Sequence, residues 1–316
     1  MRRSRSSLLA VLGAVFTSSF ALVLAQERGD DRAQGAGARV PAQAGAAGAP
    51  GGKAARMQWL LKAWEGQSKK LKTLDVHINR IDLAPAWNEE LRFEGRAVFK
   101  KPELAYLNFN KVKTTKDAKG KQVPVVNPKD GKPVSTPHET IVCTGREVWQ
   151  YLHDLRQVFV YPLAKEERKR ALDEGPLPFL FNMKAQEAER RYFLSLEGEK
   201  PDYYFVVIQP RLPEDKESFK AAWIFLDRKY LLPFRIVLFA PDGKSTKDFT
   251  LWGTQANKEF DDRYFQGGVP RRDPSDRRPP WKVVRNPDAQ GRPRGDGAVP
   301  ERQPALRPAG ADRQQR

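Results

Sequence analysis

Short runs of alternating apolar and polar residues fill the chain between Met57 and Val269. Such period-2 runs, rich in β-branched and aromatic residues, predict strands. The predicted strands are Asp75–Asp82, Glu90–Lys100, Leu104–Val112, Thr140–Thr144, Glu147–His153, Gln157–Tyr161, Arg191–Glu197, Tyr203–Gln209, Ala221–Asp227, Phe234–Ala240 and Lys247–Trp252. Turn-forming residues separate most of them, and connections this short favour antiparallel hairpins because a parallel crossover needs about a dozen residues. The pattern predicts a mainly β (α+β) fold with about 11 strands.

Three segments have helical periodicity instead. Apolar residues recur every three or four positions over Met57–Leu74, which predicts an amphipathic helix at the start of the domain. Leu163–Glu174 and Leu177–Arg190 are also predicted helices. The Lys-, Pro- and Gly-rich insert at 113–137 is predicted to be a projecting loop.

The N-terminus has the features of a secretory signal peptide. Arg2, Arg3 and Arg5 precede an apolar run at Leu8–Leu24, and small residues around Ala25 fit a cleavage site before Gln26. Residues 1–25 are therefore predicted to direct export, which gives a periplasmic or cell-envelope protein that is soluble after cleavage. The alternative is an uncleaved signal anchor, because the apolar run approaches the length of a membrane span.

Two segments have the composition of disordered linkers and tails. Residues 26–56 are rich in Ala, Gly and Pro, and residues 271–316 are rich in Pro, Gly and Arg, with too few apolar side chains to offset the entropy of ordering. The predicted domain is thus 57–270. Much of the formal net charge of +17 lies outside it. The basic 271–316 tail could contact an anionic envelope polymer or lipid, or could serve only solubility; no nucleic acid partner is expected.

Little in the sequence points to catalysis, a metal or a cofactor. Cys143 is the single cysteine, and three histidines offer no metal-binding spacing. Adjacent carboxylates such as Glu89 and Glu90 point to opposite faces of an extended chain, so they cannot act together on one substrate. We predict a non-enzymatic protein without a metal site and without a cofactor.

The amount of apolar surface is the stronger signal. Between Leu91 and Lys101 the odd positions are mostly apolar and the even ones mostly charged, which predicts a strand with one apolar face. Lys101 lies at the rim of that face, where it could cap a helix carbonyl, meet an anionic head group or remain exposed. The apolar run Pro176–Met183 could cover the mouth of a curved sheet or be an ordinary core helix. The candidate binding residues are Trp59, Trp64, Phe93, Phe99, Lys101, Trp149, Tyr151, Phe179, Leu180 and Met183.

Several of these stretches resemble the periplasmic outer-membrane lipoprotein carrier (LolA-like) family. The motifs, in the family's order, are Gly95–Leu104, Ile141–Tyr151, Gln157–Leu163, Pro178–Leu180, Ile224–Asp227, Leu232–Ile236 and Phe265–Pro270. The resemblance implies a strongly curved antiparallel sheet that forms an unclosed β-barrel, with helices over an apolar concave face that accepts acyl chains of lipoproteins. The family's carriers have arginine directly before the motif proline, where this chain has Lys101.

The resemblance leaves two functions open. The first is an exported binding protein that holds the acyl chains of a lipoprotein or a lipid under a helical lid, with a membrane-bound donor or receptor as a transient partner. The second is an envelope sensor or protein-interaction module without a transported ligand. One fold can support both, so the choice depends on the site.

Overall fold

A single 12-stranded sheet dominates the protein. The computed structural model describes residues 52–163, 183–271 and 276–285. Its helices are α2 (Lys53–Lys70), η1 (Pro85–Trp87), α5 (Ala185–Arg191), α6 (Pro213–Lys216) and η2 (Asp262–Phe265). Its strands are β1 (Thr73–Ala84), β2 (Glu89–Lys100), β3 (Leu104–Val112), β4 (Thr114–Lys116), β5 (Gln122–Pro124), β6 (Ser135–Thr144), β7 (Glu147–Leu152), β8 (Gln157–Pro162), β9 (Tyr192–Glu199), β10 (Tyr203–Pro210), β11 (Ala221–Asp227), β12 (Pro233–Phe239), β13 (Thr246–Ala256) and β14 (Lys282–Arg285).

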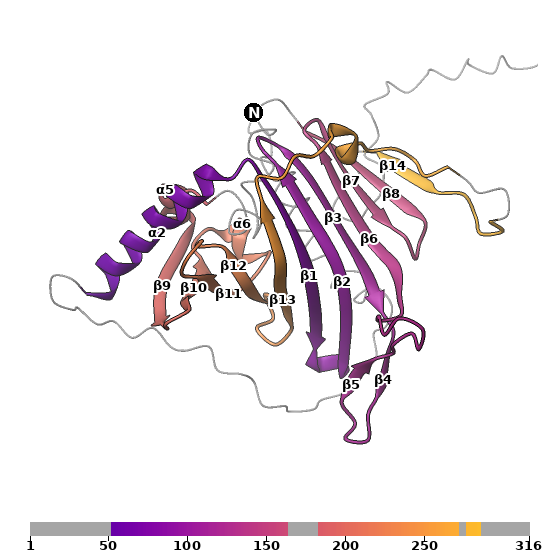
Figure 1. Ribbon diagram of the computed structural model, residues 1–316, viewed down its shortest axis with the longest axis horizontal. Coiled ribbons are helices and arrows are strands. Elements are labelled where there is room, and N and C mark those ends of the chain that lie inside the picture. The colour runs from indigo at the N-terminus through magenta and orange to yellow at the C-terminus, as the bar shows by residue number, and fades with distance from the viewer. Residues whose placement is uncertain (1–51, 164–182, 272–275, 286–316) are drawn as a thin grey trace, which may run out of the picture.

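The sheet order is β14-β8-β7-β6-β3-β2-β1-β13-β12-β11-β10-β9. Neighbouring strands pair antiparallel except β14, which runs parallel to β8. The pairing of β1 with β13 joins an N-terminal half of the sheet to a C-terminal half (Figure 1). All 11 strands predicted from the sequence are present, and the predicted fold class, a curved unclosed sheet with an N-terminal helix, is confirmed.

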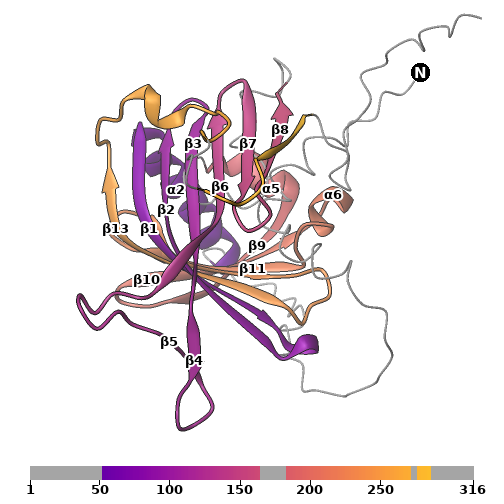
Figure 2. The ribbon, with the colours of Figure 1, turned by 90° about the vertical axis from the view of Figure 1, so that its right-hand side faces the viewer.

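The sheet is strongly bent, and Figure 2 shows β10, β11 and β13 crossing at a steep angle to β3, β6 and β7. Gly95 marks one point where two strands approach closely. A Cβ at this position would lie 2.0 Å from the carbonyl oxygen of Asn108 on β3. Only glycine tolerates this approach, so the gap in the apolar series of β2 is a requirement of the bend.

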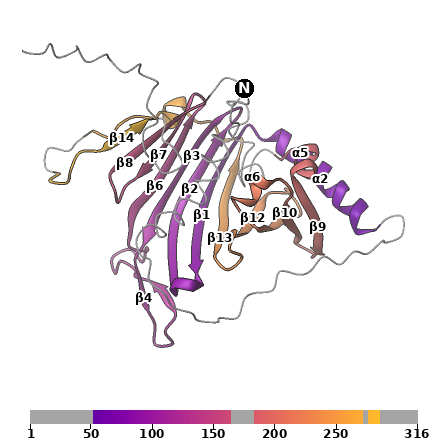
Figure 3. The same ribbon diagram turned by 180° about the vertical axis from the view of Figure 1, so that it is seen from behind.

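Helices α2 and α5 lie on the concave side of the sheet, and Figure 3 shows them beside β9, at the edge opposite β14. The prediction placed the first helix at Met57–Leu74, but α2 begins at Lys53, inside the predicted 26–56 linker, and ends at Lys70. The residues after α2 pair with the sheet instead. The Lys72 carbonyl accepts from the Lys101 N–H at 2.9 Å, and Leu74 pairs with Phe99 of β2. Long-range strand pairing thus ends the helix earlier than its periodicity does.

The 113–137 insert is not only a loop. Its strands β4 and β5 pair as a small antiparallel hairpin, and its last residues begin β6 at Ser135. The predicted helices at Leu163–Glu174 and Leu177–Arg190 fall largely outside the described residues. Of the second, the described part forms α5.

The segment after β13 packs on the convex face, which corrects the prediction that everything beyond residue 270 is disordered. Strand β14 pairs with β8, and Val284 is buried. Arg156 binds Asp276 at 2.5 Å. Trp281 and Val283 pack against an apolar cluster of Val142, Trp149, Tyr151, Val158 and Val160. The composition of the tail did not predict this strand, because few side chains of the tail are apolar. Pairing with β8 orders β14.

Candidate functional site

The concave face of the sheet is a continuous apolar surface. Alternate residues of β1–β3, β6, β7 and β9–β13 point to this face and are almost fully buried, as the period of 2 requires. On the N-terminal half they are Leu74, Val76, Ile78, Phe93, Ala97, Phe99, Ala105, Leu107, Phe109, Ile141, Cys143 and Val148. On the C-terminal half they are Leu196, Tyr204, Val206, Ile208, Ala222, Ile224, Leu226, Ile236, Leu238, Phe249 and Leu251. The two halves therefore form one apolar cluster.

Helix α2 packs on this surface with one face. Met57, Leu60, Leu61 and Trp64 recur at helical spacing and are at most 5% exposed. Trp59, on the other side of the helix, is 48% exposed and lies under the Arg56 guanidinium at 4.1 Å. The helix thus covers the concave face through a narrow apolar stripe, and most of its remaining surface faces solvent.

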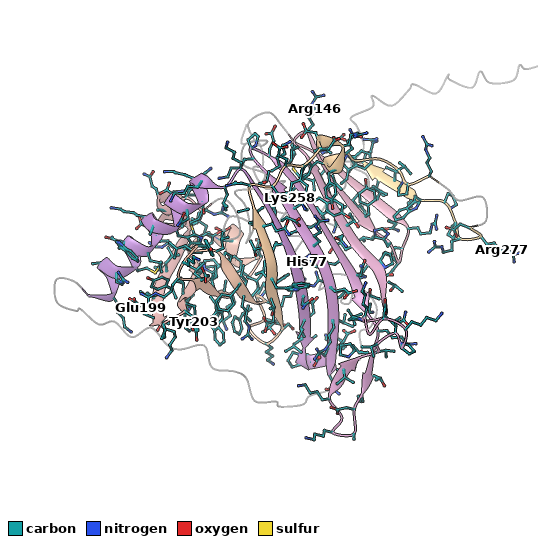
Figure 4. The ribbon with its side chains drawn as sticks, in the orientation of Figure 1. His77, Arg146, Glu199, Tyr203, Lys258 and Arg277 are labelled. Carbon is teal, nitrogen blue, oxygen red and sulfur yellow. The ribbon has the colours of Figure 1, made fainter. Side chains whose placement is uncertain are left out.

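Polar contacts fix both ends of α2. Near its C-terminus, the Lys101 Nζ donates to the Ser68 carbonyl oxygen at 2.6 Å. Near its N-terminus, Arg56 donates to both carboxylate oxygens of Glu199, at 2.9 and 3.0 Å; Figure 4 shows Glu199 at this end of the helix. A cation at the carbonyl end of a helix also interacts favourably with the helix dipole. Of the roles considered for Lys101, the structure shows the helix-capping one.

Loss of the Lys101 cap should loosen α2. Replacing Lys101 with methionine removes a charge-assisted hydrogen bond and should lower the free energy of unfolding by about 1.5–3 kcal/mol. Hydrogen–deuterium exchange of amides in 53–70 should rise. Lys100→Met is the matched control, because Lys100 binds Asp262 and the Phe260 carbonyl rather than α2. Equal exchange of α2 in the two variants would contradict the role of Lys101.

The structure brings together only part of the predicted site. Trp64, Phe93, Phe99 and Met183 share the concave apolar cluster, and Lys101 lies at its rim. Trp149 and Tyr151 lie on the convex face instead, because Val148 and Gln150 take the concave positions of β7. There Tyr151 exchanges hydrogen bonds of 3.0 Å with the backbone of Gly268.

Three further candidates differ from the buried set in other ways. Trp59 belongs to the covering helix but is half exposed. Phe179 and Leu180 lie outside the described residues. The sequence could not place Trp149 and Tyr151, because β7 is apolar or buried on both faces and alternation alone does not say which face the C-terminal segment covers.

Sequence reasoning missed a band of polar residues across the concave face. It consists of Arg80 and Asp82 on β1, Lys247 on β13, Glu139 on β6, Gln150 on β7 and Tyr161 on β8, and we call it the polar band. Its four charged residues are at most 8% exposed. A signal was present in β1, where the apolar alternation Leu74, Val76, Ile78 continues in the same phase into Arg80 and Asp82. Charged residues in phase with a buried face mark a buried polar site.

Cys143 has no features of a nucleophile. It lies on the concave face of β6, and its Sγ contacts the Glu103 carbonyl at 3.1 Å. Burial raises the pKa of the Cys143 thiol to about 11, so the reactive thiolate is scarce at neutral pH. Among the described residues, no group of three or more His, Cys, Asp or Glu side chains is placed to hold a metal ion.

No helix within the described ranges combines the length and apolar character that a membrane crossing requires.

Comparisons with known proteins agree with the fold. Residues 134–267 match the model of the outer membrane lipoprotein carrier protein LolA family. The match covers less than half of the chain, and its strands form much of the curved sheet described above. Over residues 134–267 the chain is therefore similar to this family. No curated protein sequence matches it.

Solved structures that match this chain share little sequence with it. An uncharacterized conserved protein from Thermus thermophilus is 15% identical, with 72% of this chain and 98% of that chain covered and a TM-score of 0.38. A LolA superfamily protein from Nitrosomonas europaea is 11% identical, with coverage of 67% and 97% and a TM-score of 0.31. MucA/MucB from Pseudomonas aeruginosa is 12% identical, with coverage of 67% and 61% and a TM-score of 0.34.

Proposed function

We propose that this protein is an exported, non-catalytic binding protein that holds an acyl chain of a lipid or lipoprotein between α2 and the concave face. The observation that carries the proposal is the single apolar cluster that runs over both halves of the sheet and ends under α2. The match to the lipoprotein carrier family supports the same function. Export would follow from the N-terminal residues 1–25, and a membrane-bound donor or receptor would deliver or accept the ligand.

The energetics favour an apolar ligand. Each buried CH₂ group contributes about 0.8 kcal/mol, so a partly sheltered C16 chain gains on the order of 10 kcal/mol. The ligand would take the place of the α2 side chains Leu60, Leu61 and Trp64, which now cover the concave face. Helix α2 would therefore have to move, and this movement would open the polar contacts that Lys101 and Arg56 make at its two ends.

A direct test uses acyl chains that carry bromine, which quenches tryptophan fluorescence on contact. A brominated C16 monoacylglycerol should quench the protein saturably, and Trp64→Phe should lose part of that quenching. Trp252→Phe is the control, because Trp252 is 52% exposed and stacks on His77, an exposed residue between the buried Val76 and Ile78 of β1. Quenching no stronger than that by a bromoalcohol without the chain would contradict acyl binding.

A second candidate is an interaction or sensor module in which the concave face binds only the protein's own helix. The near-complete burial of Leu60, Leu61 and Trp64 favours it. Native mass spectrometry of protein purified from its own cell envelope separates the two functions. A bound acylated species supports carriage, whereas a ligand-free mass that captures a protein partner supports the module.

The basic C-terminal segment could add a contact with an anionic envelope polymer or lipid. Deleting 286–316 would leave β14 in place and remove six basic and four acidic residues. An electrostatic contact made by this segment would weaken steeply with salt and disappear on deletion.

A further inference from the structure

The polar band crosses a surface that is otherwise apolar. Asp82 of β1 lies directly opposite Lys247 of β13, and Arg80 lies between Phe249 of β13 and Phe93 of β2. On the far side, Gln150 donates to one oxygen of Glu139 at 2.7 Å. The curvature of the sheet brings these strands toward one another, so charges on β1, β13 and β6 influence one another electrostatically.

The Arg80 guanidinium is held in a fixed position by two aromatic rings. Its centre lies 4.0 Å from the ring of Phe93 and 4.6 Å from the ring of Phe109. Its Nε is 3.0 Å from Asp82 Oδ1. Cation–π contacts of this kind orient a guanidinium while its N–H groups remain available for another acceptor.

Several atoms of the band are buried without a hydrogen-bond partner among the described residues. The donor is Arg80 Nη2, and the acceptors are Glu139 Oε2 and Asp82 Oδ2. Arg80 is 1% exposed and Glu139 is 2% exposed, so solvent does not satisfy these groups. Buried polar groups without partners are costly, and native proteins keep them chiefly where they have a use.

Resting on the acyl-binding function proposed above, we propose that the polar band binds the uncharged glyceryl ester head group of the ligand and discriminates against a free fatty acid carboxylate. The ester carbonyl accepts from Arg80 Nη2, and a glycerol hydroxyl donates to Glu139 Oε2. The acyl chain then runs from the band along Ile78, Val76 and Leu74 of β1 toward α2.

The charge of the band selects the class of head group. Arg80 and Lys247 supply two positive charges, and Asp82 and Glu139 supply two negative ones. Burial lowers the pKa of Lys247 to about 8 while Asp82 opposes this shift, so the lysine is still mainly charged at pH 7. Burial and the charge of Glu139 raise the pKa of Tyr161 to about 12, so this hydroxyl is neutral. A charged head group would therefore add an uncompensated buried charge, whereas a neutral ester adds none.

The test compares C16 ligands that differ only in the head group. Monopalmitoylglycerol and palmitate are titrated into the full chain below their micellar concentrations, by isothermal calorimetry at pH 7. A peptide with an N-terminal diacylglyceryl cysteine forms a third arm, which distinguishes a lipoprotein anchor from a free acylglycerol. In the wild type, at least one glyceryl ester should bind about tenfold or more tightly than palmitate. A tenfold difference in affinity corresponds to about 1.4 kcal/mol.

Two variants shift the charge of the band in opposite directions. Glu139→Gln leaves the band at +1 and should reduce the preference for the ester over palmitate about tenfold, whereas Lys247→Met leaves it at −1 and should increase it. Asp248→Asn is the matched control: it changes the net charge as Glu139→Gln does, but Asp248 pairs with Arg235 on the opposite face of β13. This control should keep the wild-type preference.

The outcomes separate the two proposals. If both ligand classes bind and neither band variant changes their ratio, the polar band is not the head group site, although acyl binding stands. If folded wild-type protein, verified by circular dichroism, binds neither class, the acyl-binding function itself fails. If Glu139→Gln does not fold, it is replaced by Asp82→Asn, which shifts the charge by +1 at the same site and carries the same expectation.

Discussion

Truncating Trp64 to alanine should lower the free energy of unfolding by about 3–5 kcal/mol, the range for loss of a large aromatic side chain from a packed core. Trp64 is 1% exposed, is the last residue of the α2 stripe and is part of the concave cluster. Its removal leaves a cavity between the helix and the sheet that neither can easily close. Urea denaturation of the full chain, followed by circular dichroism, measures the effect.

Trp59→Ala on the same helix is the matched control. Trp59 is 48% exposed, and its main partner is the exposed Arg56 guanidinium. An exposed cation–π contact contributes about 0.5–1 kcal/mol, so the loss should stay near that value. Similar losses in the two variants would show that α2 does not bind the concave face through the stripe that contains Trp64.

A second large loss is expected for Arg191→Met. Arg191, at the end of α5, binds Asp215 of α6 through two hydrogen bonds, one of them from Nε to Oδ2 at 3.0 Å. Both side chains are almost fully buried, at 7% and 2% exposed. Removing the arginine leaves a buried carboxylate without its countercharge, so the free energy of unfolding should fall by about 3–5 kcal/mol.

The neighbouring residue provides the control. Arg190 pairs with Glu187 one turn earlier on α5, but that arginine side chain is 63% exposed. Exposed pairs contribute about 0–1 kcal/mol, so Arg190→Met should cost little. The double variant Arg191→Met with Asp215→Leu should recover much of the stability lost in the single variant, since it removes the uncompensated charge. No recovery would indicate that the guanidinium stabilises α5 by packing rather than through Asp215.

The strands and the apolar side of β2 could be predicted from local patterns alone. In β2, the alternation through Phe93, Ala97 and Phe99 specified both the extended conformation and the buried face, because a strand presents alternate residues to opposite sides. These properties depend only on residues that are close in the sequence, so they can be predicted from the sequence.

Assignment to the concave face required the tertiary structure. Trp149 and Tyr151 match the apolar composition of a binding surface, yet they pack under Trp281 on the convex face. Strand β14 becomes ordered through β8, which lies far from it in the sequence. Local composition reports that a residue is apolar, but it does not report which distant segment will cover it.

The sequence by itself determined the β-rich domain, its antiparallel order along the chain and the amphipathic helix that precedes it, because these depend on periodicities of 2 and 3.6 residues and on turn chemistry. Only the tertiary structure decided that Lys101 caps α2 and that the polar band lies among apolar side chains. The physical reason is the bend of the sheet. It brings residues of β1, β6 and β13 together on one concave face, and no local pattern encodes that proximity.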